Sequence, residues 1–164
     1  MDEMMRRIRK KAALFLLIIL LLLSFSSCAF AEDEVRKSLG ECICYEFYSE
    51  GGFQDYTDYG KYYYQEVDFS GNEYFHIIQP EDLAVINRLL DDFEGWIKLY
   101  RQDDPAREIA AHYDFDRSVI QCGDYAHIVF EEHTWPSGDT GIAKYDIYFF
   151  DVQTNTLYYF HNNI

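Results

Sequence analysis

The sequence contains few cations, few prolines and few cysteines, and it lacks the common metal-binding motifs. Only 3 of the 164 residues are proline and only 4 are cysteine. There is no HExxH pair, no paired CxxC and no calcium loop of the D-x-D-x-D-G type. We find no internal repeat and no low-complexity stretch. We therefore expect no cofactor, and one ordinary globular domain rather than a repeat array.

Positive charge is especially scarce outside the first 31 residues. That stretch holds 5 of the 14 Lys and Arg but only 2 of the 29 Asp and Glu, which leaves 9 cations against 27 acids and a formal charge of −18 in residues 32–164. This charge argues against nucleic-acid binding, which needs a basic surface. It also argues against adhesion of the folded part to anionic lipid. It favours solubility and the electrostatic attraction of a basic partner.

The first 31 residues have the layout of a secretory signal peptide. Five cations between Arg6 and Lys11 precede an uninterrupted apolar run from Ala12 to Leu23, and Ala29-Phe30-Ala31 fits an A-x-A cleavage site. We expect export and removal of residues 1–31. Two alternatives stay open: residues 12–31 are just long enough to remain as a membrane anchor, or a lipoprotein signal ends before Cys28, whose thiol is then lipidated.

The chain after the signal is one domain's worth of sequence. Cleavage at that site leaves 133 residues, enough to bury about two-thirds of the surface that the unfolded chain exposes. We divide these residues into an N-terminal segment that contains a first strand, 32–51, and a single α+β domain, 52–164. The turn residues Ser49 to Gly52 form the expected joint.

The stretch 80–101 predicts a long amphipathic helix around which we expect the rest of the chain to fold. Its apolar residues recur at steps of three and four, which places them on one face. They are Leu83, Ile86, Leu89, Leu90, Phe93, Trp96, Ile97 and Tyr100. Pro80 suits the first helical position, and Glu94 can pair with Lys98 one turn later. Gly95 is the one local weakness and costs ~1 kcal/mol relative to alanine.

Runs of β-branched and aromatic residues predict strands on both sides of this helix. The expected strands are 42–48, 61–69 and 73–78 before it, and 118–122, 125–133, 142–151 and 156–161 after it. Short polar connections predict three hairpins, which pair 61–69 with 73–78, 118–122 with 125–133, and 142–151 with 156–161. A second short helix is expected over 105–111. The sequence therefore predicts an α+β fold: an antiparallel sheet of five to seven strands packed on one long helix.

One set of reactive side chains resembles a known enzyme family. Cys122 is followed by an Asp-Tyr-Ala step, then by His133 with a tryptophan two residues on, then by Asp146. Over about 25 residues this order resembles transglutaminase-like cysteine hydrolases, and the resemblance implies a Cys122 thiolate activated by His133 and oriented by Asp146. That family places its cysteine at a helix start. Here a strand pattern separates Cys122 from His133, which would hold them roughly 30 Å apart or more.

Two further groups of side chains are candidates for metal or disulfide bonds. Glu131 and His133 lie two residues apart in a predicted strand, so they share a face and could ligate a metal with Asp146 or His161. Three cysteines remain after cleavage. Cys44, or its neighbour Cys42, could form a disulfide with Cys122. The alternative is that all three thiols stay reduced.

Aromatic residues are abundant: 15 Tyr, 13 Phe and 2 Trp. Neighbouring side chains of a strand point to opposite faces, so some rings of each tyrosine run have to face away from the core. The candidate binding residues are Tyr62, Tyr63, Tyr64, Trp135, Tyr158 and Tyr159. Exposed together, these rings would stack on a sugar or contact a protein. The alternative is that the tyrosines cover a thin sheet and keep their hydroxyls in water.

Taken together, these patterns favour an exported bacterial domain that is a non-enzymatic binding module. We expect it to act outside the cytoplasm, secreted or attached to the outer face of the cell membrane. The expected partner is a protein or carbohydrate, not nucleic acid, with membrane contact only through the N-terminal segment. Two alternatives are an inhibitor or immunity-like protein whose acidic surface masks a basic partner, and a cysteine hydrolase that uses Cys122, His133 and Asp146.

Overall fold

A computed structural model describes residues 34–52 and 55–163 of the chain. The expected cleavage site and the candidate lipidation site at Cys28 lie outside the described residues. By its internal contacts the chain divides into two units, 1–40 and 41–164. The described part of the first unit contains a helical turn at 34–37. The first strand belongs to the second unit.

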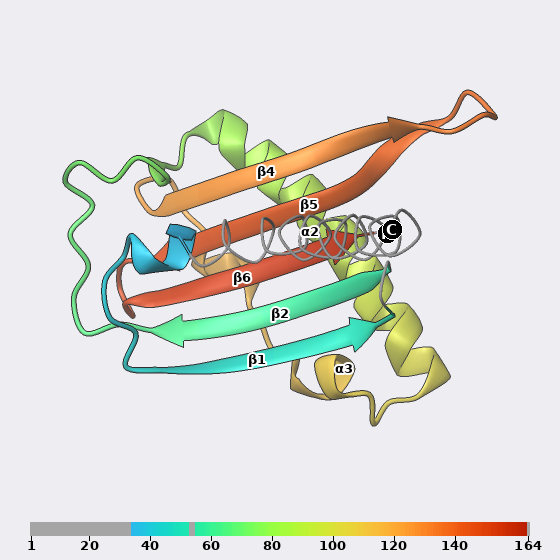
Figure 1. The fold of residues 1–164 in the computed structure, drawn as a ribbon, viewed down its shortest axis with the longest axis horizontal. Coiled ribbons are helices and arrows are strands. Elements are labelled where there is room, and N and C mark those ends of the chain that lie inside the picture. Colours follow the sequence, from blue (N-terminus) through green and yellow to red (C-terminus); the bar gives the residue numbers. More distant parts are fainter. Residues whose placement is uncertain (1–33, 53–54, 164) are drawn as a thin grey trace, which may run out of the picture. The chain divides into compact units, whose positions relative to one another are not determined.

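Six antiparallel strands form the sheet of the second unit (Figure 1). Their order across the sheet is β1-β2-β6-β5-β4-β3, and every neighbouring pair is antiparallel. The strands are β1 (Cys44–Gly51), β2 (Tyr56–Tyr63), β3 (His76–Ile77), β4 (Tyr125–Thr134), β5 (Thr140–Asp151) and β6 (Thr156–Asn163). With one long helix and one short one beside it, this sheet confirms the predicted α+β fold.

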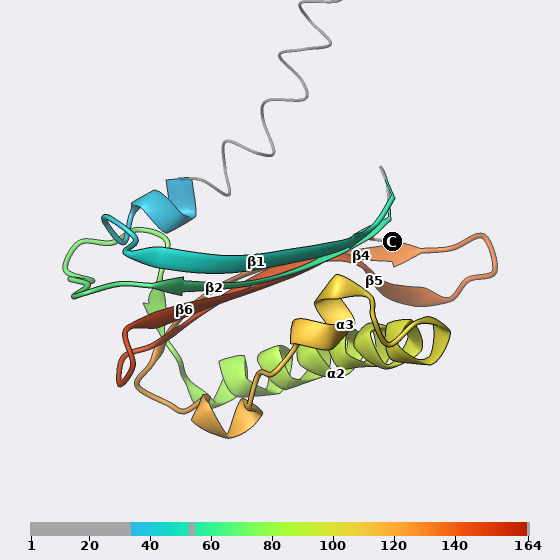
Figure 2. The same ribbon diagram turned by 90° about the horizontal axis from the view of Figure 1, so that it is seen from below.

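The long helix α2 (Pro80–Asp103) and the short helix α3 (Glu108–His112) both lie on one side of the sheet (Figure 2). The buried stripe of α2 includes Phe93, whose ring meets that of Phe160 on β6 edge to face at 5.4 Å. Tyr59, Ile147 and Phe149 complete the same core from β2 and β5. Burying this many large side chains supplies most of the hydrophobic stabilisation, at about 1.5–3 kcal/mol each. We call this side of the sheet the helix face, and the other side the open face.

Helix α2 confirms the expected range and runs through Gly95 without a break. Its start is fixed by Asp82, whose carboxylate accepts a hydrogen bond of 2.8 Å from the backbone N–H of Gln79. The expected Glu94–Lys98 pair is replaced by other contacts. The Glu94 carboxylate accepts hydrogen bonds from the Tyr113 hydroxyl at 3.0 Å and from the Arg117 guanidinium at 2.8 Å. These bonds tie the segment after α3 back onto α2.

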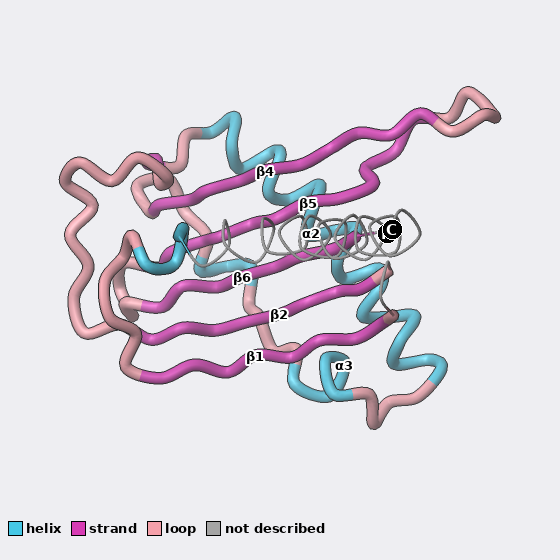
Figure 3. The backbone as a smooth tube through the Cα atoms, viewed as in Figure 1, coloured by secondary structure: helices cyan, strands magenta, loops and turns pink. Residues whose placement is uncertain are grey.

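The first expected hairpin, 61–69 with 73–78, is wrong. Strand β2 ends at Tyr63 and pairs with β1 and β6, and β3 pairs with β4. Between β2 and β3 the chain forms a long loop (Figure 3). In this loop Asp68 accepts a hydrogen bond from the backbone of Ser70, and Asn72 accepts two from the backbones of residues 74 and 75. In these turns, backbone N–H groups donate to side-chain oxygens of the loop and are therefore not available to pair with a neighbouring strand.

The hairpin expected around residues 123–124 is also wrong, because residues 118–122 form no strand. Residues 117–119 form a 3-10 turn, and the Asp116 carboxylate accepts a hydrogen bond from the Ser118 backbone at its start. The last expected hairpin is confirmed as β5 and β6, joined by a turn in which Asn155 has a φ of 52°. The short helix begins at Glu108, three residues later than expected. Within the described ranges, no helix is long and apolar enough to cross a membrane.

Candidate functional site

Strand β1 lies at one edge of the sheet, with β2 as its only strand neighbour among the described residues. All eight residues of β1 pair with β2 without a break in register. In an antiparallel strand every second residue directs its N–H and C=O away from a given neighbour, so an edge strand presents a row of unpaired backbone groups. Helix α3 packs under β1 on the helix face, where the Tyr48 ring stacks on His112 at 4.4 Å. Residues 44–51 are thus held in extended form, with no described strand paired to their outer edge.

Three large apolar side chains along this edge are exposed on the open face. Ile43 is 64% exposed, Tyr45 is 67% exposed and Phe47 is 41% exposed. The ring of Tyr45 stacks on that of Tyr62 in β2, with centroids 5.7 Å apart. Phe47 lies beside Gly60, where an added Cβ would come within 3.3 Å of the Phe47 ring. We call Ile43, Tyr45, Phe47 and the outer backbone of β1 the β1 edge. Neighbouring exposed apolar side chains of this kind are typical of a contact site.

The opposite edge of the sheet differs from the β1 edge in its pairing and in its charge. Strand β3 pairs with β4 at Tyr125 and Ala126, and the β4–β5 register shifts between Glu131 and Glu132, where Ala143 of β5 is the extra residue. A bulge together with charged side chains is a common way to block an edge. Strand β1 has no proline, lysine or bulge. Its residue Glu46 lies on the helix face, where Lys61 approaches the carboxylate to 3.3 Å. Among the described residues, β1 therefore presents a full-length edge without a bulge, whereas β4, which also exposes Val129 and Phe130, carries two adjacent acids beside a register shift.

A buried charged row crosses the open face next to the β1 edge. Asp58, His161 and Asp146 lie opposite one another on β2, β6 and β5. The Asp146 carboxylate accepts hydrogen bonds from His161 Nδ1 at 2.7 Å and from the Tyr159 hydroxyl at 3.0 Å. The His161 side chain is 0% exposed, and the ring of Tyr56 stacks on it at 4.6 Å. The contacts of His161 and Asp146 therefore lie in the interior of the domain and connect β6 to β5.

The two carboxylates of this row differ in their surroundings. Burial raises the pKa of Asp58, because the Ser49 hydroxyl and His161 only partly compensate for lost hydration. Burial also acts on Asp146, but the hydrogen bonds from His161 and Tyr159 outweigh it and hold the pKa of Asp146 below its ordinary value. Asp58 Oδ1 and His161 Nε2 are buried and have no hydrogen-bond partner among the described residues. Unsatisfied buried groups of this kind destabilise a fold.

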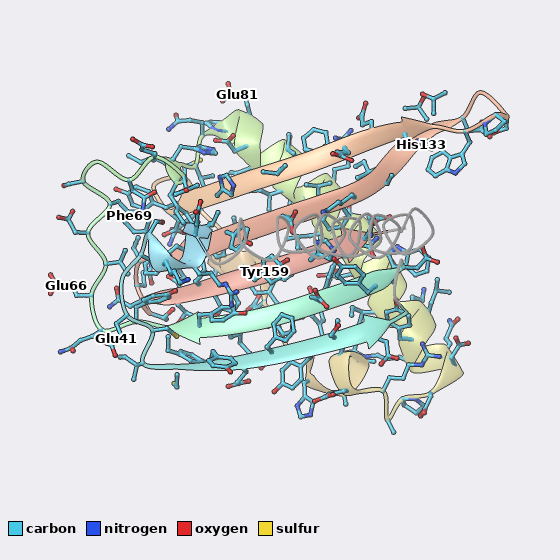
Figure 4. The ribbon with its side chains drawn as sticks, in the orientation of Figure 1. Glu41, Glu66, Phe69, Glu81, His133 and Tyr159 are labelled. Atoms are coloured by element: carbon cyan, nitrogen blue, oxygen red, sulfur yellow. The ribbon has the colours of Figure 1, made fainter. Side chains whose placement is uncertain are left out.

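The structure does not bring the predicted aromatic binding residues onto one surface. Tyr62, Tyr64 and Tyr159 are buried, and the hydroxyl of the half-buried Tyr63 donates a hydrogen bond to Glu46. Tyr158 is also half-buried. Trp135 is 38% exposed in the turn after β4, where its ring packs against His133. Figure 4 shows His133 towards the tip of the β4–β5 hairpin and Tyr159 over the middle of the sheet.

The candidate hydrolase residues are also kept apart. Cys122 precedes β4 and His133 is the ninth residue of this strand, so the eight steps from Tyr125 to His133 alone span about 26 Å. Asp146 accepts its hydrogen bonds from His161 and Tyr159 rather than from His133. Glu131 and His133 keep alternate positions in β4, because the residue skipped at the register shift of this hairpin is Ala143 of β5. No group of three or more potential metal ligands lies together in the part of the chain that the structure describes.

The predicted disulfide between Cys44 and Cys122 is wrong, since both thiols are free and exposed. Cys44 begins β1, and Cys122 lies just before β4 on the other side of β2, β6 and β5. Four strand spacings of about 4.8 Å put the two residues roughly 19 Å apart. A disulfide needs Cα atoms closer than about 7 Å. Cys42 is free as well.

The fold and this site define an α+β domain with one unprotected, apolar edge strand. Comparisons of the chain with models of protein families, with curated proteins and with solved structures found no match. Sequence reasoning missed the three side chains of the β1 edge. The available signal was the alternation of Ile43, Tyr45 and Phe47 in the first predicted strand. That alternation reveals one face of a strand, but only the strand order reveals that the strand lies at an edge.

Proposed function

We propose that this chain is an exported, non-enzymatic binding module that pairs an extended segment of a partner polypeptide with β1. The observation that carries the proposal is the unprotected β1 edge with its three exposed apolar side chains. In strand addition the main-chain hydrogen bonds provide affinity, and the alternate side chains provide specificity. A row of backbone donors and acceptors at β spacing fits a polypeptide and not a carbohydrate. The partner is therefore expected to be a protein.

The two faces of β1 define the side chains that a paired segment would carry. On the open face it would place apolar side chains beside Tyr45 and Phe47. On the helix face it would meet Glu46, whose side chain is 42% exposed, and Glu50, whose side chain is 25% exposed. A segment that alternates apolar and basic residues satisfies both faces. The formal charge of −18 on residues 32–164 would also speed the approach of such a segment.

The excess of acidic residues suits the alternative role of a protein that masks a basic partner. In that case the charge of the whole domain, and not the β1 edge, would carry the binding. Affinity would then fall steeply as salt rises, because exposed charges are screened within about 8 Å at physiological ionic strength. Strand addition instead predicts a modest dependence on salt and a strong dependence on the apolar side chains of β1.

A short peptide tests the proposal directly. The probe is an eight-residue peptide that alternates lysine with valine, titrated calorimetrically into residues 32–164. Phe47→Lys adds the kind of charge that natural proteins use to block an edge. We expect it to weaken binding by about 2 kcal/mol, the loss typical of a central aromatic contact. Leu99→Lys is the matched control, because Leu99 is 50% exposed on α2. Equal losses in the two variants, or no binding by wild type, would refute strand addition at β1.

The export part of the proposal rests on the N-terminal sequence and has its own test. Cleavage after Ala31 predicts a mature protein that begins at Glu32, which N-terminal sequencing of the exported protein would identify. A lipid on Cys28 would instead appear as incorporated labelled palmitate that is lost in Cys28→Ser. Recovery of the full-length chain with its N-terminal methionine in the membrane fraction would contradict removal of residues 1–31.

A further inference from the structure

A pocket lies where the end of the sheet meets the C-terminal half of α2. Its volume is ≈ 240 Å³, and it is lined by Asp55, Tyr56, Thr57, Trp96, Tyr100, Asn162 and Asn163. A space of this size holds about eight water molecules, at roughly 30 Å³ each. It is therefore too small for most drug-sized ligands and suits a compact head group. We propose that this pocket binds a small organic cation of the quaternary ammonium class.

Two aromatic rings from α2 form one wall of the pocket. Trp96 and Tyr100 are one helical turn apart, so they lie on the same side of α2, and their ring centroids are 6.3 Å apart. The π faces of tryptophan and tyrosine carry negative electrostatic potential and attract cations, and paired rings of this type recognise quaternary ammonium groups. The Tyr100 ring already attracts a cation, because the guanidinium of Arg107 lies 5.2 Å from its centroid.

The floor of the pocket is polar, and its groups bind one another. The Thr57 hydroxyl donates a hydrogen bond of 2.8 Å to the Asn162 side-chain oxygen and lies 3.0 Å from the Tyr100 hydroxyl. The Asn162 amide donates to Asp92 at 3.4 Å. These side chains have used much of their hydrogen-bonding capacity. A sugar, which needs several donors and acceptors, would find few here, whereas a quaternary ammonium group needs none.

The charge around the pocket favours a cation. None of the seven lining residues is Lys, Arg or His, and the exposed Asp55 supplies a carboxylate. Arg107 is balanced by two acids, because its guanidinium lies 3.9 Å from Glu50 and 3.9 Å from Asp103. A ligand cation would therefore meet two rings and a carboxylate, and the positive charge of Arg107 at the Tyr100 ring is offset by Glu50 and Asp103. This inference does not depend on strand addition at β1, because the two sites share no side chain.

Tryptophan fluorescence gives a direct readout of this pocket. The chain has two tryptophans, so Trp135→Phe leaves Trp96 as the only one. Choline is titrated into this variant of residues 32–164 beside its neutral isostere 3,3-dimethyl-1-butanol, with glucose as a third ligand and constant ionic strength. We expect choline to change the Trp96 emission with saturation, and the neutral isostere to bind two- to thirtyfold more weakly, the range that a cation–π contact provides.

An exposed side chain supplies a variant that leaves the fold intact. In the Trp135→Phe background, Asp55→Asn is expected to weaken choline binding several-fold and to leave binding of the neutral isostere unchanged. Glu66→Gln is the matched control, because it removes one exposed acid from the loop at the other end of the sheet (Figure 4). Equal affinity for choline and its isostere, binding of glucose but not choline, or equal effects of the two substitutions would each overturn the proposal.

Discussion

Replacing Asp146 by asparagine should severely destabilise the domain. The Asp146 side chain is 16% exposed and accepts hydrogen bonds from His161 and Tyr159. Asparagine keeps the size of the side chain but removes the negative charge, so the buried imidazole loses its carboxylate. Hydrogen bonds to a charged group are worth about 1.5–3 kcal/mol each, so removing the charge that accepts two of them should cost about 3–5 kcal/mol in total. Domains of this size are stable by about 5–15 kcal/mol, and with a slope near 2 kcal/mol/M the urea midpoint should fall by roughly 2 M.

Asp58→Asn is the matched control for this prediction, because Asp58 lies opposite His161 on the other side. Its Oδ1 is buried without a partner among the described residues, and burial raises its pKa. The charged form of Asp58 is therefore unfavourable in the folded protein. We expect Asp58→Asn to be neutral at pH 7 or to stabilise the domain by about 1 kcal/mol. The pair of variants separates a stabilising buried carboxylate from a destabilising one.

The pH dependence of unfolding should have opposite signs for the two residues. The folded-state pKa of Asp146 is lowered, so its contribution is complete above the unfolded pKa of about 4 and is lost as pH falls through the lower folded value. The folded-state pKa of Asp58 is raised, so its ionisation destabilises the fold as pH rises through that value. Urea unfolding of residues 32–164 across this range measures both. A loss below 1 kcal/mol for Asp146→Asn, or a larger loss for Asp58→Asn, would refute the reasoning.

Three further outcomes follow from the core, the sheet and the thiols. Phe93→Ala removes a fully buried ring that contacts Phe160 and should cost about 3–5 kcal/mol in urea unfolding; a loss under 1 kcal/mol would show that α2 is not the main core element. Gly60→Ala brings a Cβ to 2.8 Å from the Tyr62 ring and should lower the free energy of unfolding by about 1–3 kcal/mol. An unchanged midpoint of urea unfolding would contradict this crowding. Because Cys44 and Cys122 are both free, both should react with a maleimide in the native protein, and a reductant should leave the melting temperature unchanged.

Local sequence patterns predicted the elements that depend mainly on their own residues. The helix 80–101 was recognisable because its apolar stripe and first turn lie within one segment. The hairpin of β5 and β6 was recognisable because its strands are joined by a short polar turn, and its register follows from neighbouring residues. In both cases the interactions that decide the structure span few residues of sequence.

Long-range pairing decided the parts that the sequence did not reveal. Strand β2 pairs with β6, so Tyr59 lies opposite Phe160 about a hundred residues later, and no local pattern signals this partner. The same strand order leaves β1 at an edge and keeps Cys44 far from Cys122. The sequence analysis also expected the wrong tyrosines to be exposed. The runs at 62–64 and 158–159 lie in or next to inner strands and are largely covered, whereas Tyr45 on the edge strand is exposed.

Hydrogen exchange of β1 tests strand addition most directly. In the free domain, the outward amides of residues 44–51 should exchange fast while the inward ones are held by β2. Adding the alternating lysine–valine peptide should slow the outward amides at every second position of β1 and leave the amides of β4 unchanged. Slowing that is confined to β4 or α2, or bound peptide with no change in β1, would contradict the proposal that β1 is the docking strand.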